Sequence, residues 1–296
     1  MSFASDVKKE MTQNIPGKDC CRTSFMYGLL ICGRSFGITL TGHTTENRYV
    51  AGAYCDAVSA LCGHKAEVSV TAHGSYSVKM TDQADTIKIL ESFGHTGTEL
   101  CRRVNRAVFS CDSCFDAFLA GAFLSCGTVT DPSKDYHLEF STAHRMLASD
   151  IALILGESGF SPKQVRRNSS YVIYFKDSES IEDLLVRTGA SKASLSLMGE
   201  KMYKDMRNHV NRQVNFENAN LGKTAKAAAE EIKAIKNIEE KKGLSILPDT
   251  LRSVALIRLA NPDYSLARIG QELDPPISRS GAYHRMMKII DISSQL

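Results

Sequence analysis

The stretch Phe118-Leu-Ala-Gly-Ala-Phe-Leu-Ser-Cys-Gly127 decides the fold, because it is apolar on nearly every face while small residues run through it. Small residues at helical spacing let a second helix approach closely enough for backbone contact. A similar stretch, Phe25-Met-Tyr-Gly-Leu-Leu-Ile-Cys-Gly33, shares the aromatic start, the small-residue step and the Cys-Gly end. The two stretches predict a pair of helices packed against each other at the centre of a pseudo-symmetric fold.

The pattern resembles the LAGLIDADG signature of homing endonucleases, and Leu119-Ala-Gly121 followed by Gly127 is the closer copy. The resemblance implies an acid before each final glycine, and two acids that together hold a divalent metal over DNA. Here that position is Cys126 in the second stretch, and Cys32 or Gly33 in the first, depending on the alignment. Mg²⁺ prefers oxygen ligands, which a thiol replaces poorly. The sequence therefore keeps the small residues that pack the two helices but lacks the metal-binding acids. The alternative interpretation is that the two stretches are ordinary buried helices unrelated to this signature.

The segments after the two stretches follow one order, which indicates an internal duplication. Each half is expected to contain a helix, a strand, a helix, two strands and a helix. The single strand is expected at Ser35–Leu40 in the first half and at His137–Ser141 in the second. Alternating hairpins are expected near residues 67–80 and 164–175.

Three short amphipathic helices are predicted in the last fifty residues. Their expected bounds are Pro248–Ala260, Leu266–Leu273 and Arg279–Ile290. Ser265 and Ser278 are suited to cap the second and third helices, and Ile277 supplies an inward apolar residue in the turn between them. A short helix, a tight turn and a capped helix together predict a helix-turn-helix.

The outward face of the third helix is the candidate DNA-reading surface. Arg279, near its start, could read guanine through two hydrogen bonds. Arg268, Arg285 and Lys288 are expected to contact phosphate, which contributes salt dependence rather than sequence choice. A three-helix packing unit that does not bind DNA is the alternative. The predicted DNA-binding residues are Ser278, Arg279, Ser280, Tyr283, His284, Arg285, Lys288 and Arg268.

The expected fold class is therefore α+β: a pseudo-symmetric two-lobed, LAGLIDADG homing-endonuclease-like domain followed by an all-α helix-turn-helix domain. The degenerate nuclease-like domain is expected at residues 1–215, with lobes of about 1–100 and 101–200. A helical linker is expected at 216–245 and the helix-turn-helix at 246–296.

Charge supports this division. Residues 1–200 hold 20 Lys and Arg against 22 Asp and Glu, whereas residues 201–296 hold 16 against 11, within a net charge of +3. A basic C-terminal third on a near-neutral body is typical of a DNA-binding module. No apolar run reaches membrane-spanning length, and the N-terminus lacks the apolar core of a signal peptide. We expect a cytoplasmic, nucleoid-associated protein.

All nine cysteines lie between Cys20 and Cys126, and their odd number favours reduced thiols. Cys111-Asp-Ser-Cys114 and the pair Cys20-Cys21 could together make a four-thiolate zinc site. Such sites usually combine two C-x-x-C pairs, and adjacent cysteines are awkward joint ligands. We therefore expect buried, apolar cysteines, with no bound metal and no cofactor.

Taken together, the chain resembles the WhiA family of bacterial regulators over essentially its full length. The segments that carry the resemblance are Met1-Ser-Phe-Ala-Ser-Asp-Val-Lys8, Cys20-Cys-Arg22, Gly121-Ala-Phe-Leu124, Asp131-Pro-Ser-Lys-Asp-Tyr-His-Leu-Glu-Phe140, Met206-Arg-Asn-His-Val-Asn-Arg212, Asn218-Ala-Asn-Leu221, Ile277-Ser-Arg-Ser-Gly281 and His284-Arg285.

The resemblance implies a non-enzymatic regulator that binds double-stranded DNA and has no catalytic residues. It implies a role in transcription control, cell division, chromosome segregation and, in spore formers, sporulation. The DNA-reading role carries over to Ser278–Lys288, although Tyr283 stands where the family typically has asparagine. Another transcription regulator or RNA polymerase is the candidate protein partner, and the sequence leaves the oligomeric state open.

Two other functions compete with this one. An active divalent-metal DNA endonuclease would have to recruit other acids, such as Asp131 or Asp135, although no acid stands at the end of the first central helix. An adaptor would instead use the N-terminal lobes to bind a partner protein.

Overall fold

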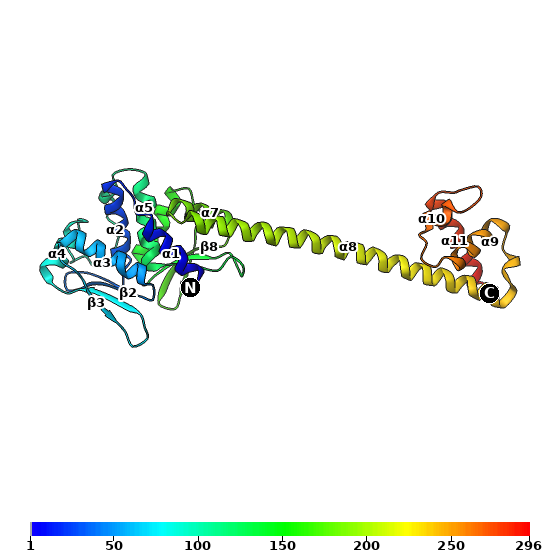
Figure 1. The fold of residues 1–296 in the computed structure, drawn as a ribbon, viewed down its shortest axis with the longest axis horizontal. Helices are drawn as coiled ribbons and strands as arrows, with labels where there is room; N and C mark the ends of the chain where they lie inside the picture. Colours follow the sequence, from blue (N-terminus) through cyan, green and yellow to red (C-terminus); the bar gives the residue numbers. More distant parts are fainter. Residues whose placement is uncertain (1) are drawn as a thin grey trace. The chain divides into compact units, whose positions relative to one another are not determined.

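The computed structural model describes residues 2–296, which form two compact units: one ends at Lys204 and the other runs Asp205–Leu296 (Figure 1). The first lobe of the N-terminal unit comprises α1 (Phe3–Gln13), α2 (Asp19–Ile31), β1 (Ser35–Phe36), β2 (Thr41–Thr45), α3 (Arg48–Cys62), β3 (Glu67–Val70), β4 (Tyr76–Met80) and α4 (Gln83–Glu91). A short 3₁₀ helix, η1 (Arg106–Val108), follows. The second lobe comprises α5 (Ser113–Cys126), β5 (Gly127–Val129), β6 (Leu138–Thr142), α6 (Arg145–Glu157), β7 (Lys163–Arg167), β8 (Ser170–Phe175) and α7 (Ser178–Arg187).

Each lobe contains one four-stranded antiparallel sheet. The strand order is β1-β2-β4-β3 in the first lobe and β5-β6-β8-β7 in the second. The central strands pair over five residues in both sheets, from Thr41 opposite Met80 and from Leu138 opposite Phe175. The predicted α+β fold with two pseudo-symmetric lobes is therefore confirmed.

Each lobe has one strand more than the sequence predicted. The expected strand Ser35–Leu40 is wrong, because β1 covers only its first two residues and the longer strand β2 begins at Thr41. In the second lobe β5 lies directly after α5, ahead of the expected strand at β6. Strands of two or three residues are too short to show an alternating pattern, so sequence periodicity could not reveal them.

The two central helices, α2 and α5, pack backbone against backbone (Figure 1). A Cβ atom on Gly28 would lie 2.1 Å from the carbonyl oxygen of Phe118, and one on Gly121 would lie 2.0 Å from that of Phe25. Ser125 Oγ donates a hydrogen bond to the Leu29 carbonyl at 2.5 Å. The helix pair predicted from the two quoted stretches is confirmed, with the two glycines at its closest approach.

The last helices of the two lobes, α4 and α7, begin with the same kind of cap. Asp82 Oδ1 accepts the N–H of Asp85 at 3.0 Å at the start of α4. Asp177 Oδ2 accepts the N–H of Ser180 at 2.9 Å at the start of α7. A carboxylate at this position satisfies a backbone N–H that lacks a helical partner. The duplication therefore extends from the order of elements to the capping of this pair of helices.

The remaining elements are helical: α8 (Ser191–Lys242), η2 (Leu244–Ile246), α9 (Asp249–Ala260), α10 (Leu266–Gln271) and α11 (Arg279–Ser294). Helix α8 ends at Lys242, and Gly243 follows it with a φ of +76°, which suits glycine. The core of the C-terminal unit joins Ile235 and Ile238 of α8 to apolar residues of α9, α10 and α11. Over residues 2–296, none of the helices combines the length and apolar character needed to cross a membrane.

Candidate nucleic-acid interface

A close backbone approach fixes the angle between α10 and α11. Ser265 Oγ accepts the N–H of Arg268 at 3.3 Å, which starts α10. The Ile277 N–H donates to the Gly270 carbonyl at 2.8 Å, and a Cβ atom on Gly270 would lie 2.5 Å from the Ile277 carbonyl oxygen. Ser278 Oγ then accepts the N–H of Gly281 at 3.2 Å and starts α11. The predicted capped helix-turn-helix is therefore formed.

Helix α11 has one buried and one exposed face. Ala282, Met286 and Ile289 are buried against α9 and α10, as their spacing predicted. The side chain of Tyr283 is 50% exposed, and its ring centroid lies 5.9 Å from that of His284. An apolar inner face and a polar outer face are what a recognition helix requires.

Seven of the eight predicted DNA-binding residues are exposed: Arg268, Ser278, Arg279, Ser280, Tyr283, His284 and Lys288. The eighth, Arg285, is half-buried, and its Nη1 donates to the Thr250 carbonyl at 3.3 Å. The guanidinium of Arg268 lies 4.6 Å from the centroid of the Tyr264 ring. The face is thus polar and cationic, and Arg285 also holds α11 against α9.

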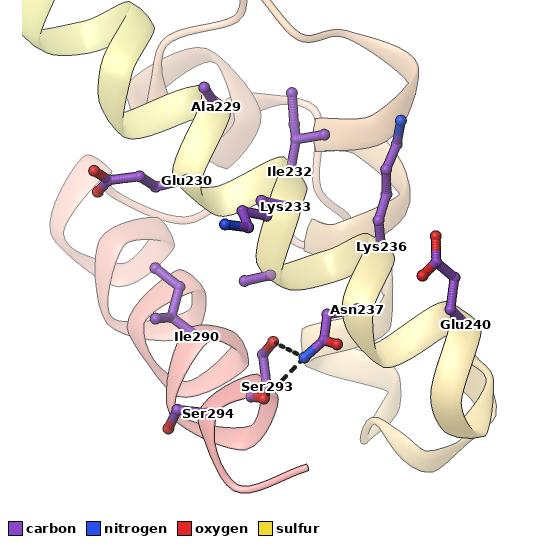
Figure 2. A pocket seen from close by; sticks show the side chains of 11 residues that line it. Ala229, Glu230, Ile232, Lys233, Lys236, Asn237, Glu240, Ile290, Ser293 and Ser294 are labelled. Atoms are coloured by element: carbon purple, nitrogen blue, oxygen red, sulfur yellow. Dashed lines mark hydrogen bonds between the residues drawn. The ribbon is translucent and has the colours of Figure 1, made fainter.

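The C-terminal part of α8 packs against the three helices of the helix-turn-helix domain. Figure 2 shows Asn237 of α8 reaching toward Ser293 of α11. Its Nδ2 donates to both the carbonyl oxygen and Oγ of Ser293, each at 3.0 Å. Lys233, Lys236 and Ile290 line the hollow around this contact.

A buried ion pair also ties α8 to the helix-turn-helix. Arg258 of α9 is 1% exposed, and its Nε lies 2.8 Å from Oε2 of Glu231, which is 5% exposed. Arg258 Nη1 also donates to the carbonyls of Pro262 and Tyr264 at 3.2 and 2.5 Å. Burial raises the pKa of Glu231, and the Arg258 guanidinium opposes that rise. This pair could not be predicted from the sequence, because its partners are twenty-seven residues apart on different helices.

In the N-terminal unit, cations cover the carboxyl ends of both central helices. Arg102 Nη1 donates to the carbonyls of Ile31 and Gly33 at 3.1 and 2.8 Å, at the end of α2. Lys8 Nζ donates to the Leu124 carbonyl at 3.1 Å, near the end of α5. Positive charge is favourable where helix carbonyls lack partners. The sequence did not indicate either residue, because both come from distant segments.

The two cysteines expected at the acid positions meet between these cations. A hydrogen bond with Cys126, together with burial, raises the pKa of Cys32 well above its ordinary value, so this thiol stays protonated. Burial, reinforced by the Lys8 ammonium, lowers the pKa of His43 to about 4. The helix ends therefore present the protonated Cys32 thiol and a neutral His43 imidazole beside Lys8 and Arg102, and burial lowers the pKa of both of these cations.

The acids that an endonuclease might recruit are used in a local turn. Asp131 lies in the loop after β5, where its Oδ1 accepts hydrogen bonds from the N–H and Oγ of Ser133 at 2.9 and 2.7 Å. These bonds lower the pKa of Asp131. Asp135 Oδ1 accepts the N–H of Tyr136 at 2.8 Å.

Two domain-family models match the chain. The "WhiA LAGLIDADG-like domain" matches residues 115–207, and the "WhiA C-terminal HTH domain" matches residues 210–293. Among curated relatives, the "Probable cell division protein WhiA" of Clostridium botulinum (strain Hall) is 34% identical over 279 residues, which cover 90% of this chain and 88% of the relative. Its counterpart in Clostridium perfringens (strain SM101) is 34% identical over 321 residues, which cover 100% and 98%.

Solved structures give the same fold. Full-length WhiA from Thermatoga maritima superposes with a TM-score of 0.63 at 23% identity, covering 100% of this chain and 99% of that one. The N-terminal LAGLIDADG domain of WhiA superposes with a TM-score of 0.50 at 17% identity, covering 64% and 92%.

Proposed function

Because this chain belongs to the WhiA family, we propose that it is a sequence-specific DNA-binding regulator of transcription whose nuclease-like unit does not cleave DNA. The observation that carries this proposal is the outer face of α11. That face combines a capped N-terminus, an exposed arginine in the first turn and exposed polar side chains over the next two turns. The names of the relatives, probable cell division proteins, support cell division as the process that the regulated genes serve. Chromosome segregation and, in spore formers, sporulation are proposed from the family resemblance alone.

The predicted residues divide into two roles. Ser278, Arg279 and Ser280 stand at the N-terminal end of α11, the end that a recognition helix presents to base edges. Its unpaired N–H groups and positive dipole also favour a phosphate there. Tyr283 and His284 continue the same face. The cations Arg268, Arg285 and Lys288 are assigned to phosphate contacts, which set position and salt dependence.

Arg279→Ala and Lys288→Ala are expected to weaken DNA binding in different ways. Loss of Arg279 should relax the preference at one base position and cost about 1–3 kcal/mol on the preferred site. Loss of Lys288 should weaken all sequences alike and reduce the salt slope by about 1. The measurement is fluorescence anisotropy of full-length protein over a salt series, on a site recovered from genomic DNA and on scrambled DNA.

Lys65→Ala, in the N-terminal unit, is the matched control, since it removes one exposed cation far along the sequence from α11. If Arg279→Ala weakened scrambled and preferred DNA equally, Arg279 would be a phosphate contact. If none of the α11 variants changed affinity, the proposed interface would be wrong.

Among the residues that the structure describes, the ends of α2 and α5 lack the ligands that a metal-dependent nuclease needs. A divalent ion there would face the ammonium of Lys8, the guanidinium of Arg102 and a protonated thiol on Cys32. None of these groups is a ligand for Mg²⁺, which needs carboxylate, carbonyl or water oxygens. The nearby carbonyls of Leu124, Ile31 and Gly33 already accept hydrogen bonds from these cations.

We expect that the full-length protein, mixed with sheared genomic DNA and Mg²⁺, retains intact fragments that share a short site. Sequencing the bound fragments reads both their identity and their ends. A recurrent new end would show cleavage and contradict the proposal. Loss of that end in Asp131→Ala or Asp135→Ala would then locate the metal ligands in the loop after β5.

A further inference from the structure

Four cysteine side chains from two distant segments converge in the N-terminal unit. Cys20 and Cys21 lie in the first turn of α2, Cys114 lies in the first turn of α5, and Cys111 precedes that helix. Their four sulfur atoms all lie within 4.8 Å of one another. Cys21 and Cys114 are buried, whereas Cys20 and Cys111 are half-buried, so the cluster is reachable from one side.

The separations match those of a single tetrahedral ion. A zinc–sulfur bond of about 2.3 Å places the sulfurs of a tetrahedral site about 3.8 Å apart. The Cys111 sulfur lies 3.8 Å from that of Cys20, 3.6 Å from that of Cys21 and 3.5 Å from that of Cys114. The Cys20 and Cys21 sulfurs are 4.0 Å apart. These four separations are close to those around one ion with four thiolate ligands, and the remaining two pairs of sulfurs lie within 4.8 Å.

We propose that Cys20, Cys21, Cys111 and Cys114 bind one zinc ion that joins the N-terminal ends of the two central helices. The adjacent cysteines, which looked unsuitable from the sequence, both reach the site because the first turn of α2 directs their sulfurs to the same point. Such a site lies at the opposite ends of α2 and α5 from those covered by Lys8 and Arg102, and it takes no part in DNA binding.

The surroundings suit thiolate ligands. Four thiolates around Zn²⁺ carry a net charge of −2, and the protons of the thiols leave to solvent when the ion binds. The first turns of α2 and α5 both contribute the positive end of a helix dipole, which stabilises negative sulfur. Zinc would thus link the first lobe to the second at a point where each helix favours an anion.

The test is the metal content of full-length protein, produced with zinc in the medium and purified with a phosphine reductant and no chelator. About one zinc per chain is expected in the parent. Cys114→Ser and the double variant Cys21→Ser/Cys114→Ser should lose most of it. Cys101→Ser is the matched control, since Cys101 is exposed and outside the cluster, and it should keep the metal.

A second measurement does not depend on whether the variants fold. Cobalt(II) added to metal-free parent protein should produce the intense visible bands of a tetrahedral site together with sulfur-to-metal charge transfer. Zinc should then displace the cobalt. Parent protein that binds neither ion, or a double variant that keeps its zinc, would overturn the proposal. A disulfide among the four cysteines that persists in protein purified with the phosphine reductant, detected by thiol counting, would also overturn it.

Discussion

Gly121→Ala is expected to cost about 3 kcal/mol or more in the free energy of unfolding of the N-terminal unit. The added Cβ would lie 2.0 Å from the Phe25 carbonyl oxygen and 2.8 Å from the Leu29 nitrogen. Both are backbone atoms of a helix, so they cannot rotate away as a side chain would. The helices must separate, and apolar side chains along the whole contact would lose packing. Gly28→Ala should behave alike, because its Cβ would meet the Phe118 carbonyl at 2.1 Å.

Urea unfolding followed by circular dichroism measures this cost, with the two units fitted as separate transitions. Gly52→Ala is the matched control: Gly52 also lies inside a helix, but nothing lies within 4 Å of its added Cβ. That variant should be stabilised by about 0.5–1 kcal/mol, because alanine is the better helix former. Equal effects of Gly52→Ala and Gly121→Ala would contradict the close approach of α2 and α5.

Arg258→Ala should have the largest effect in the C-terminal unit, about 3–5 kcal/mol. The change leaves the Glu231 carboxylate buried without its cation, and the carbonyls of Pro262 and Tyr264 lose a donor. Thermal and urea unfolding of the full chain measure the loss. Arg279→Ala, which removes an exposed arginine from the same unit, should stay within about 0.5 kcal/mol of the parent.

The deficit of Arg258→Ala should depend on pH with a definite sign. Burial raises the pKa of Glu231 above its ordinary value of 4.5, so the folded state binds that proton more tightly than the unfolded state. Stability from this group is therefore lost as pH rises from 4.5 through the raised pKa. Without Arg258 the pKa should rise further, and the deficit should be larger at neutral pH than in acid. In the double variant Arg258→Ala/Glu231→Gln, the loss of stability should no longer depend on pH. A pH-independent loss in Arg258→Ala itself would show that the Glu231 carboxyl does not cause it.

Local pattern was sufficient for the helices and their inner faces. Two predictions that each depend on a single helix are confirmed. One is the close packing of the stretch Phe118–Gly127, and the other is the buried face of α11 formed by Ala282, Met286 and Ile289. The strands β1 and β5 were missed because two or three residues carry no period.

Contacts between distant segments could not be predicted in the same way. The covering of α2 by Arg102 and of α5 by Lys8 depends on tertiary packing, which hydrophobic periodicity does not encode. Glu231 and Arg258 are a further case, since each looks like an ordinary helix-surface charge in sequence. The cysteine cluster was visible as residue types, but its convergence depends on how the central helices align.

Lys8 and Arg102 have a consequence for how the N-terminal unit responds to its ionic surroundings. A metal at the helix ends would exchange with solution, so its occupancy would follow the magnesium concentration. The two side chains belong to the chain itself and are present at fixed stoichiometry, about 3 Å from the carbonyls that they neutralise. Every folded copy of the protein therefore carries the two cations that balance the partial negative charge at the carboxyl ends of α2 and α5. We therefore expect the stability of this fold not to depend on the magnesium concentration, even when the cell is starved of magnesium or the ion is removed by a chelator.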